Sequence, residues 1–201
     1  LNLPRMGLNS RRDFTAENAM RTRIDGGTIQ AEPGTVAKGY LEAGELSDGC
    51  GIIRVPVIVV NGRHDGPLLY LQGGAHGQET IYAVEVLRRL LFTQLQPEML
   101  RGAVVAVPIA NPLAHQAACR VSPQYAAREG IPYGGDLHKV WPGDPRGSIT
   151  QRIAHVLWTT IVSRCDFAID YHAVSLPGMA FSFMYRGGKT EAVGTPQWER
   201  S

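Results

Sequence analysis

The feature that most constrains the fold is a glycine-rich turn, residues 73–79 (GGAHGQE), between an apolar strand and an amphipathic helix. The residues before it, 68–71, are apolar, and those after it, 79–95, carry apolar side chains at helical spacing. A strand that leads directly into a helix is typical of α/β proteins. Ligands of such sheets bind at the carboxyl ends of the strands, where this turn falls. The turn therefore predicts an α/β fold and a ligand-binding site at the end of the strand that precedes it.

Other strands and helices alternate along the chain. The β-branched run 52–60 predicts a strand, and Pro56, which lacks a backbone donor, predicts that this strand lies at a sheet edge. Turn residues after it predict a hairpin with 68–71. The remaining predicted elements are a buried strand at 103–109, a helix from the capping box Ser148-x-x-Gln151 to about residue 164, and strands at 166–171 and 180–185.

This alternation predicts an α/β fold with a mixed, mostly parallel sheet and helices on both faces. We divide the chain into an N-terminal arm at 1–25, a main domain at 26–185, and a polar segment at 186–201. The last segment contains three glycines and one proline, and we interpret it as a tail or as a connector to a missing C-terminal part.

Composition argues against several classes of function. Lys and Arg total 20 against 18 for Asp and Glu, so the formal net charge is +2, which gives no basis for a nucleic-acid or anionic-membrane surface. Apolar runs are all shorter than the roughly 18 residues that a membrane-spanning helix needs. The three cysteines show no CxxC pair, which argues against a disulfide framework or a Cys-based zinc site. We expect a cytoplasmic protein with neither nucleic acid nor membrane as a partner.

Metal-ligand residue types lie at two strand ends. His76 and Glu79 belong to the glycine-rich turn, and His172 follows the apolar strand 166–171. Hydrolytic zinc sites commonly combine two His, one Glu and a water. Asp170, two positions before His172, either supports that histidine or faces the core. Taken one at a time, the three are better explained as a turn histidine, a helix-terminal acid favoured by the helix dipole and a core histidine, but their combination favours a metal site.

The turn G-G-x-H-G-x-E and the D-x-H strand end resemble the succinylglutamate desuccinylase/aspartoacylase family of zinc hydrolases, within the zinc carboxypeptidase superfamily. Four further matching segments lie between them: VPIANP (107–112), RVSP (120–123), WPGD (141–144) and GSITQRIAH (147–155). The resemblance runs from about residue 51 to 185 and is closest to bacterial enzymes that deacylate small N-acyl amino acids, including N-acetyl-diaminobutyrate. It implies a zinc-carboxypeptidase-like fold and a zinc-hydrolase-like catalytic domain at 26–185.

The resemblance also implies roles for single residues. The zinc ligands would be His76, Glu79 and His172, and Arg120 would be a catalytic residue that polarises the substrate carbonyl or stabilises the oxyanion.

Three further residues would bind substrate: Asn111, His138 and Lys139. The family usually has Asn-Arg where this chain has His138-Lys139, and that pair grips the substrate carboxylate. Lysine keeps the charge but loses the bidentate geometry of arginine. His138 can donate a hydrogen bond in place of Asn, or bind a second metal. This departure makes the substrate preference the least determined property of the chain.

The expected function is that of a deacylase, a Zn²⁺-dependent amidohydrolase that acts on the linear amide of a small N-acyl substrate through a metal-activated water. The family's general-base glutamate lies downstream of the third ligand. Neither Glu191 nor Glu199 follows a convincing strand, so we assign no base. The alternative is a non-catalytic or truncated zinc-binding domain that lacks this glutamate. The sequence leaves open the acyl group, the amine half and whether the chain forms a homo-oligomer.

Overall fold

The computed structural model describes residues 23–46, 49–123, 135–173, 182–186 and 189–193. The chain forms two compact units, Asn18–Ala173 and a smaller unit of Leu1–Glu17 with Val174–Ser201. In the smaller unit, β8 (Ser182–Arg186) pairs antiparallel with β9 (Lys189–Val193). The segment interpreted as a tail or connector therefore contains a strand.

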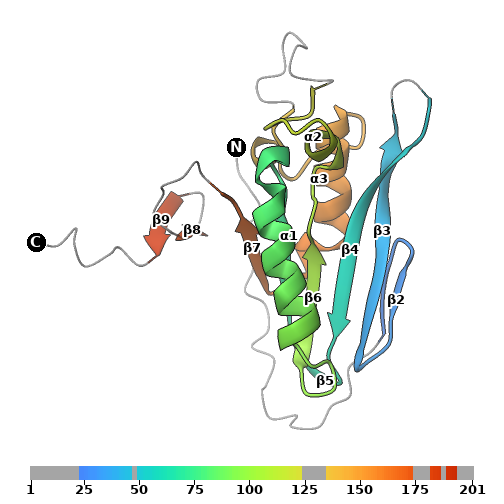
Figure 1. Ribbon diagram of the computed structural model, residues 1–201, viewed down its shortest axis with the longest axis vertical. Helices are drawn as coiled ribbons and strands as arrows, with labels where there is room; N and C mark the ends of the chain where they lie inside the picture. The colour runs from blue at the N-terminus through green and yellow to red at the C-terminus, as the bar shows by residue number, and fades with distance from the viewer. Residues whose placement is uncertain (1–22, 47–48, 124–134, 174–181, 187–188, 194–201) are drawn as a thin grey trace, which may run out of the picture. The chain divides into compact units, whose positions relative to one another are not determined.

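The larger unit is built on a five-stranded sheet of order β3-β4-β6-β5-β7 (Figure 1). The strands are β3 (Thr35–Glu45), β4 (Ile52–Asn61), β5 (His64–Gly73), β6 (Arg101–Val107) and β7 (Phe167–Tyr171). The pairs β3–β4 and β4–β6 are antiparallel, whereas β5–β6 and β5–β7 are parallel. A mixed α/β sheet is thus confirmed, but a parallel majority is not, since the described pairings divide equally. A short hairpin of β1 (Ile24–Gly26) and β2 (Ile29–Ala31) precedes β3.

Two local predictions for β4 are wrong. It is not an edge strand, because it pairs with β3 on one side and β6 on the other. Pro56 is tolerated because β6 pairs only with 58–61, so the part of β4 that contains Pro56 has β3 as its one described neighbour. Nor do β4 and β5 form a hairpin, since β6 lies between them. The backbone N–H of Gly62, just after β4, donates to Gly102 of β6 at 2.9 Å.

The helix after the glycine-rich turn is confirmed, with a change of winding at each end. It begins with a 3-10 turn, η1 (Gly77–Glu79), continues as α1 (Thr80–Arg89) and ends in a π-helical turn, η2 (Leu90–Gln94). Within the described part of the chain, no helix is both long enough and apolar enough to cross a membrane.

The capping box at the start of α3 (Ile149–Thr160) is also confirmed. The Ser148 hydroxyl accepts from the Gln151 N–H at 3.2 Å, and the Gln151 side-chain oxygen accepts from the Ser148 N–H at 2.8 Å. Each bond satisfies a donor that the first helical turn leaves unpaired. The shorter helical segments are α2 (Pro112–Gln116), η4 (Leu137–Lys139) and η5 (Val162–Arg164).

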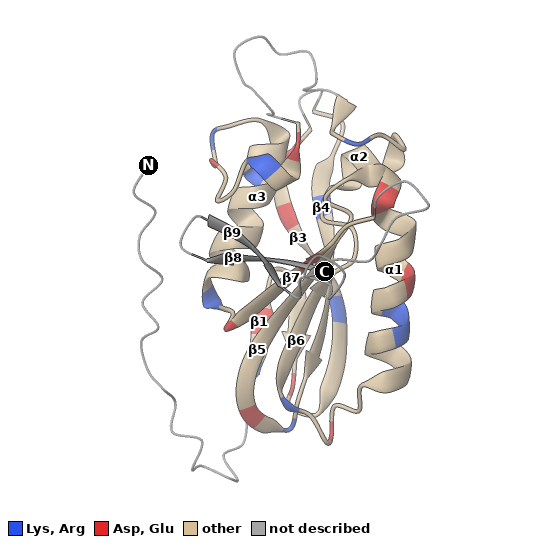
Figure 2. Ribbon diagram, turned by 90° about the vertical axis from the view of Figure 1, so that its left-hand side faces the viewer, with Lys and Arg blue, Asp and Glu red and all other residues tan. Residues whose placement is uncertain are grey.

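The core is divided by the sheet. Val105 and Val107 of β6 belong to a buried cluster that includes α3, whereas Val104 and Ala106 belong to a cluster with Leu87 of α1. Successive side chains of a strand point to opposite faces. Figure 2 shows α1 and α3 on either side of the strands. Coverage of β6 on both faces explains why its sequence is continuously apolar.

Ser148→Ala is expected to lower the free energy of unfolding by about 1 kcal/mol, because it removes the helix cap of α3. Urea denaturation of the two proteins measures the difference. The matched control is Ser163→Ala at an exposed serine of η5, which should change the stability by less than about 0.5 kcal/mol. Equal effects of the two substitutions would contradict a stabilising role of the cap.

Candidate metal centre

The glycine-rich turn and the second strand end meet at one edge of the sheet. Strands β5 and β7 are parallel neighbours, and their register pairs Gly73 with Tyr171 at the last residue of each. His76 follows β5 by three residues, and His172 comes directly after β7. Parallel pairing therefore brings together two histidines that are 96 positions apart in the chain.

Glycines allow the turn to fold this tightly. Gly74 has a φ of 64°, in the left-handed region that side chains rarely adopt. A Cβ at Gly77 would overlap the backbone carbonyl of Ala114 in α2. Both positions flank His76, so the local sequence fixes where this histidine lies.

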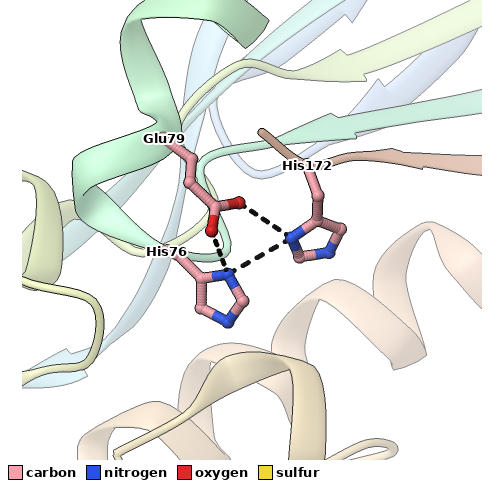
Figure 3. A group of neighbouring side chains, drawn as sticks. All are labelled: His76, Glu79 and His172. Carbon is pink, nitrogen blue, oxygen red and sulfur yellow. Dashed lines mark hydrogen bonds and ion pairs between the residues drawn. The ribbon is translucent and has the colours of Figure 1, made fainter. Parts of the chain in front are cut away.

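Three side chains converge at this edge (Figure 3). His76 Nδ1 lies 2.9 Å from Oε1 of Glu79, His172 Nδ1 lies 3.0 Å from Oε2 of Glu79, and the two Nδ1 atoms are 3.2 Å apart. Zinc–nitrogen distances of about 2.0–2.1 Å in a tetrahedral arrangement separate two ligand atoms by about 3.4 Å. The observed spacing is thus close to that of three ligands around one ion.

The other ring nitrogen of each histidine faces a carboxylate. His76 Nε2 lies 3.2 Å from Asp136 Oδ1, and His172 Nε2 lies 3.1 Å from Asp170 Oδ2. A carboxylate only accepts, so with a cation at Nδ1 the carboxylates of Asp136 and Asp170 would hold the proton of each ring on Nε2. Protons on both Nδ1 atoms would face each other across 3.2 Å, whereas a divalent cation satisfies both lone pairs and the Glu79 carboxylate. This donor set fits a metal such as zinc.

Electrostatics distinguish the histidines around the cluster. The hydrogen bond to Asp170 raises the pKa of His172 to about 9, with a smaller contribution from Glu79 and against the effect of burial. His172 is therefore protonated on both ring nitrogens at neutral pH, and a cation that binds Nδ1 displaces one of these protons. Burial lowers the pKa of His138, and the nearby His172 lowers it further. His138 is therefore neutral at neutral pH.

Two of the other predicted residues reach the cluster. Arg120 Nη1 lies 3.3 Å from Oε1 of Glu79, and the Arg120 side chain is 54% exposed. The ring of His138 lies edge-on to that of His172, with 5.1 Å between the ring centroids. Lys139 follows in η4 and is exposed.

Asn111 is not brought to the cluster. Its side chain is completely buried, and its Oδ1 accepts from the Ala114 N–H at 3.2 Å and from the Ser122 hydroxyl at 2.9 Å. It caps the N-terminus of α2. Its Nδ2 is buried and has no hydrogen-bond partner among the described residues, and the contact of Asn111 with substrate stays a prediction.

Sequence reasoning gave no role to Asp136. Its side chain is buried, and its Oδ1 contacts His76 and also accepts from the His138 N–H at 3.0 Å. The local signal is an N-cap aspartate before the turn η4, and such caps are common without any metal. The contact with His76 spans 60 positions and depends on the tertiary fold.

The model of the succinylglutamate desuccinylase/aspartoacylase catalytic domain matches residues 65–181, a span that contains all three converging side chains. The N-alpha-acetyl-L-2,4-diaminobutyric acid deacetylase of Halomonas elongata is 34% identical to the chain over 148 residues, which are 73% of this chain and 40% of that protein.

Solved structures are similar as well. The succinylglutamate desuccinylase/aspartoacylase from Rhodobacter sphaeroides is 34% identical with a TM-score of 0.55, over 68% of this chain and 40% of that one. The product-bound ectoine utilization protein EutE (DoeB) from Ruegeria pomeroyi is 26% identical with a TM-score of 0.57, over 78% and 44%. The chain thus spans about 40% of the length of these relatives.

Asp136→Ala is expected to weaken zinc binding about 10–100-fold, because His76 loses the carboxylate that holds its Nε2 proton. Competition with a chromophoric chelator measures the affinity. The control is Asp144→Ala, an exposed aspartate whose Oδ1 accepts from the N–H of Arg146. Unchanged zinc affinity in Asp136→Ala would show that this carboxylate does not orient a ligand.

Proposed function

Because the chain belongs to the succinylglutamate desuccinylase/aspartoacylase family, we propose that it is a zinc-dependent deacylase that hydrolyses the amide bond of a small N-acyl amino acid or related acylamine. The observation that carries this proposal is the convergence of His76, Glu79 and His172 on one point at the end of two parallel strands. Two imidazoles and one carboxylate form the ligand set of hydrolytic zinc sites that keep a position for water.

His76, Glu79 and His172 would hold the metal through the atoms that already face one another. Bound zinc supplies polarisation of the scissile carbonyl and a lower pKa for a bound water, near about 7. Asp136 and Asp170 keep a proton on Nε2 of the two histidines and so fix both ring orientations.

Arg120 is suited to stabilise the developing oxyanion. One of its donors contacts Glu79, which holds the guanidinium beside the cluster, and the half-exposed side chain has further N–H groups for a ligand. Donors that are already in place when negative charge develops on the carbonyl oxygen commonly lower such a barrier by several kcal/mol.

The carboxylates that contact the cluster within the described ranges each have a histidine partner. Glu79 contacts both histidines and Arg120, while Asp136 and Asp170 each contact one histidine. The second candidate function is a zinc-binding domain without catalysis. Zinc content and turnover, measured together, separate the two.

The exposed residues beside the cluster suggest where a substrate carboxylate would bind. A relative is named as a deacetylase of N-alpha-acetyl-L-2,4-diaminobutyric acid, a substrate with both an acyl group and a carboxylate. Lys139 is an exposed cation in η4, next to His138, whose ring contacts that of His172. We propose that Lys139 pairs with the substrate carboxylate and that His138 donates a hydrogen bond to it.

His76→Ala is expected to remove the metal and, with it, any turnover. Elemental analysis, run beside amine release from N-acetyl and N-succinyl amino acids, should find about one zinc per chain in the wild type and a small fraction of that in the variant. His64→Ala, at the opposite end of β5, is the control and should retain zinc.

Each outcome of that experiment decides between the candidates. Zinc with turnover supports the deacylase, and zinc without turnover supports the non-catalytic domain. A wild-type protein that takes up no zinc on reconstitution overturns both, and unchanged zinc in His76→Ala shows that the turn is not the site.

Lys139→Arg is expected to tighten binding of carboxylate-bearing ligands several-fold, because a guanidinium binds a carboxylate through two parallel hydrogen bonds. Inhibition by an N-acyl amino acid should strengthen, while inhibition by the matching amide, which has no carboxylate, stays constant. Equal behaviour of the two inhibitors would exclude Lys139 from substrate binding.

A further inference from the structure

A buried polar network connects the segments that surround the candidate metal centre. It consists of Asn111, Ser122 and Thr150, whose side chains are all completely buried. Ser122 lies in the middle: its hydroxyl donates to Asn111 Oδ1 at 2.9 Å and accepts from the Thr150 hydroxyl at 3.2 Å. Thr150 belongs to α3 and Asn111 is the N-cap of α2, so one hydroxyl joins two helices.

The backbone of Ser122 leads to the carboxylate that faces His76. Its N–H donates to the carbonyl of Gly135 at 3.1 Å. Gly135 directly precedes Asp136, whose Oδ1 lies 3.2 Å from His76 Nε2. The two segments are also closely packed, because a Cβ at Gly135 would lie 3.1 Å from the backbone oxygen of Ser122. The position of Ser122 therefore restrains that of Asp136.

The side chain of Ser122 leads to the turn that carries His76. Its partner Asn111 donates its backbone N–H to the carbonyl of Gly74 at 2.9 Å, two residues before His76. Asn111 Oδ1 also accepts from the Ala114 N–H, and the backbone carbonyl of Ala114 lies against Gly77, the residue after His76. Both flanks of His76 are thus held from the start of α2.

From these contacts we propose that Ser122 is a positioning residue, which holds Asp136 in register with His76 and thereby strengthens zinc binding without being a ligand. Its hydroxyl connects through Asn111 to the turn of His76, and its backbone connects through Gly135 to Asp136. The two atoms that must stay in hydrogen-bond contact, His76 Nε2 and Asp136 Oδ1, therefore share one support. The inference rests on the proposed function in one respect, the assignment of His76 as a zinc ligand.

The hydroxyl and the backbone of Ser122 can be separated by substitution. Ser122→Ala keeps the backbone bond to Gly135 but removes both side-chain bonds, so the buried Thr150 hydroxyl loses its acceptor and Asn111 Oδ1 loses one of its donors. Residue 122 and Gly135 are then free to shift together and to carry Asp136 with them. Hydrogen bonds weaken steeply when their geometry is lost, so the support of the His76 ring weakens.

The test is a double-mutant cycle for zinc affinity, measured on metal-free protein by competition with a chromophoric chelator. Ser122→Ala is expected to weaken zinc binding about three- to tenfold, less than the about 10–100-fold expected when the Asp136 carboxylate itself is removed. In the Asp136→Ala background, Ser122→Ala should have no further effect, because the group that it positions is gone. Ile29→Val, at a buried core position in β2, controls for a general loss of stability and should leave zinc affinity unchanged.

Thr150→Val is a second variant that carries the test where Ser122→Ala does not fold. It removes the donor to the Ser122 hydroxyl and leaves a side chain of nearly the same shape. It should weaken zinc binding less than Ser122→Ala does, and this effect should also vanish in the Asp136→Ala background. Circular dichroism confirms that each variant is folded.

Four results would count against the positioning role. Equal zinc affinity of the wild type and the folded Ser122 or Thr150 variant overturns it and leaves the proposed function intact. A loss that persists in full in Asp136→Ala overturns it as well, since Ser122 then acts by another route, for example through Arg120 two residues before it. A comparable loss in Ile29→Val shows that zinc affinity only follows stability. No zinc bound by the wild type overturns the positioning role and the proposed function together.

Discussion

Parallel pairing between β5 and β7 aligns the carboxyl ends of two strands, with Gly73 opposite Tyr171. The convergence of the three candidate metal ligands depends on that alignment. The turn after β5 supplies His76 and leads into η1 at Glu79, and the first residue after β7 is His172. A shift of the register by one residue would move side chains to the other face of the sheet and separate the two halves of the cluster. Buried β6, which pairs with β5 on its other side, holds that register.

The alignment also supplies the partners that stabilise the buried carboxylate of Glu79. Its carboxylate is almost fully buried, and a buried carboxylate is costly unless it is paired and hydrogen-bonded. It contacts the two histidines, Arg120, and the backbone N–H of Ala173 at 3.2 Å. These partners come from three separate segments, so the charge is stable only once the tertiary fold has formed. A preorganised anion between two imidazoles is suited to attract a cation.

Sequence patterns correctly predicted those elements that depend on interactions between residues close together in the chain. The glycines of the turn, the capping box of α3 and the apolar run of β6 have the structures that their patterns indicate. Strand order was not predictable in this way, because turn residues after β4 indicate a reversal but not that β6 occupies the neighbouring position. The buried position of Asn111, from which it caps α2, was likewise not predicted from the local sequence. The contact of Asp136 with His76 joins residues 60 positions apart and exists only in the folded chain.

The cluster has a closed side and an open side. His76 and Asp136 are buried, whereas His172 and Asp170 are accessible to solvent, although the two pairs have the same chemistry and nearly the same hydrogen-bond length. A ligand held from the closed side is fixed before any substrate arrives, while the open side must exchange protons, water and substrate. Arg120, His138 and Lys139 are all at least partly exposed. Under the proposed function, substitutions on the closed side should therefore act through metal affinity, and those on the open side through substrate binding.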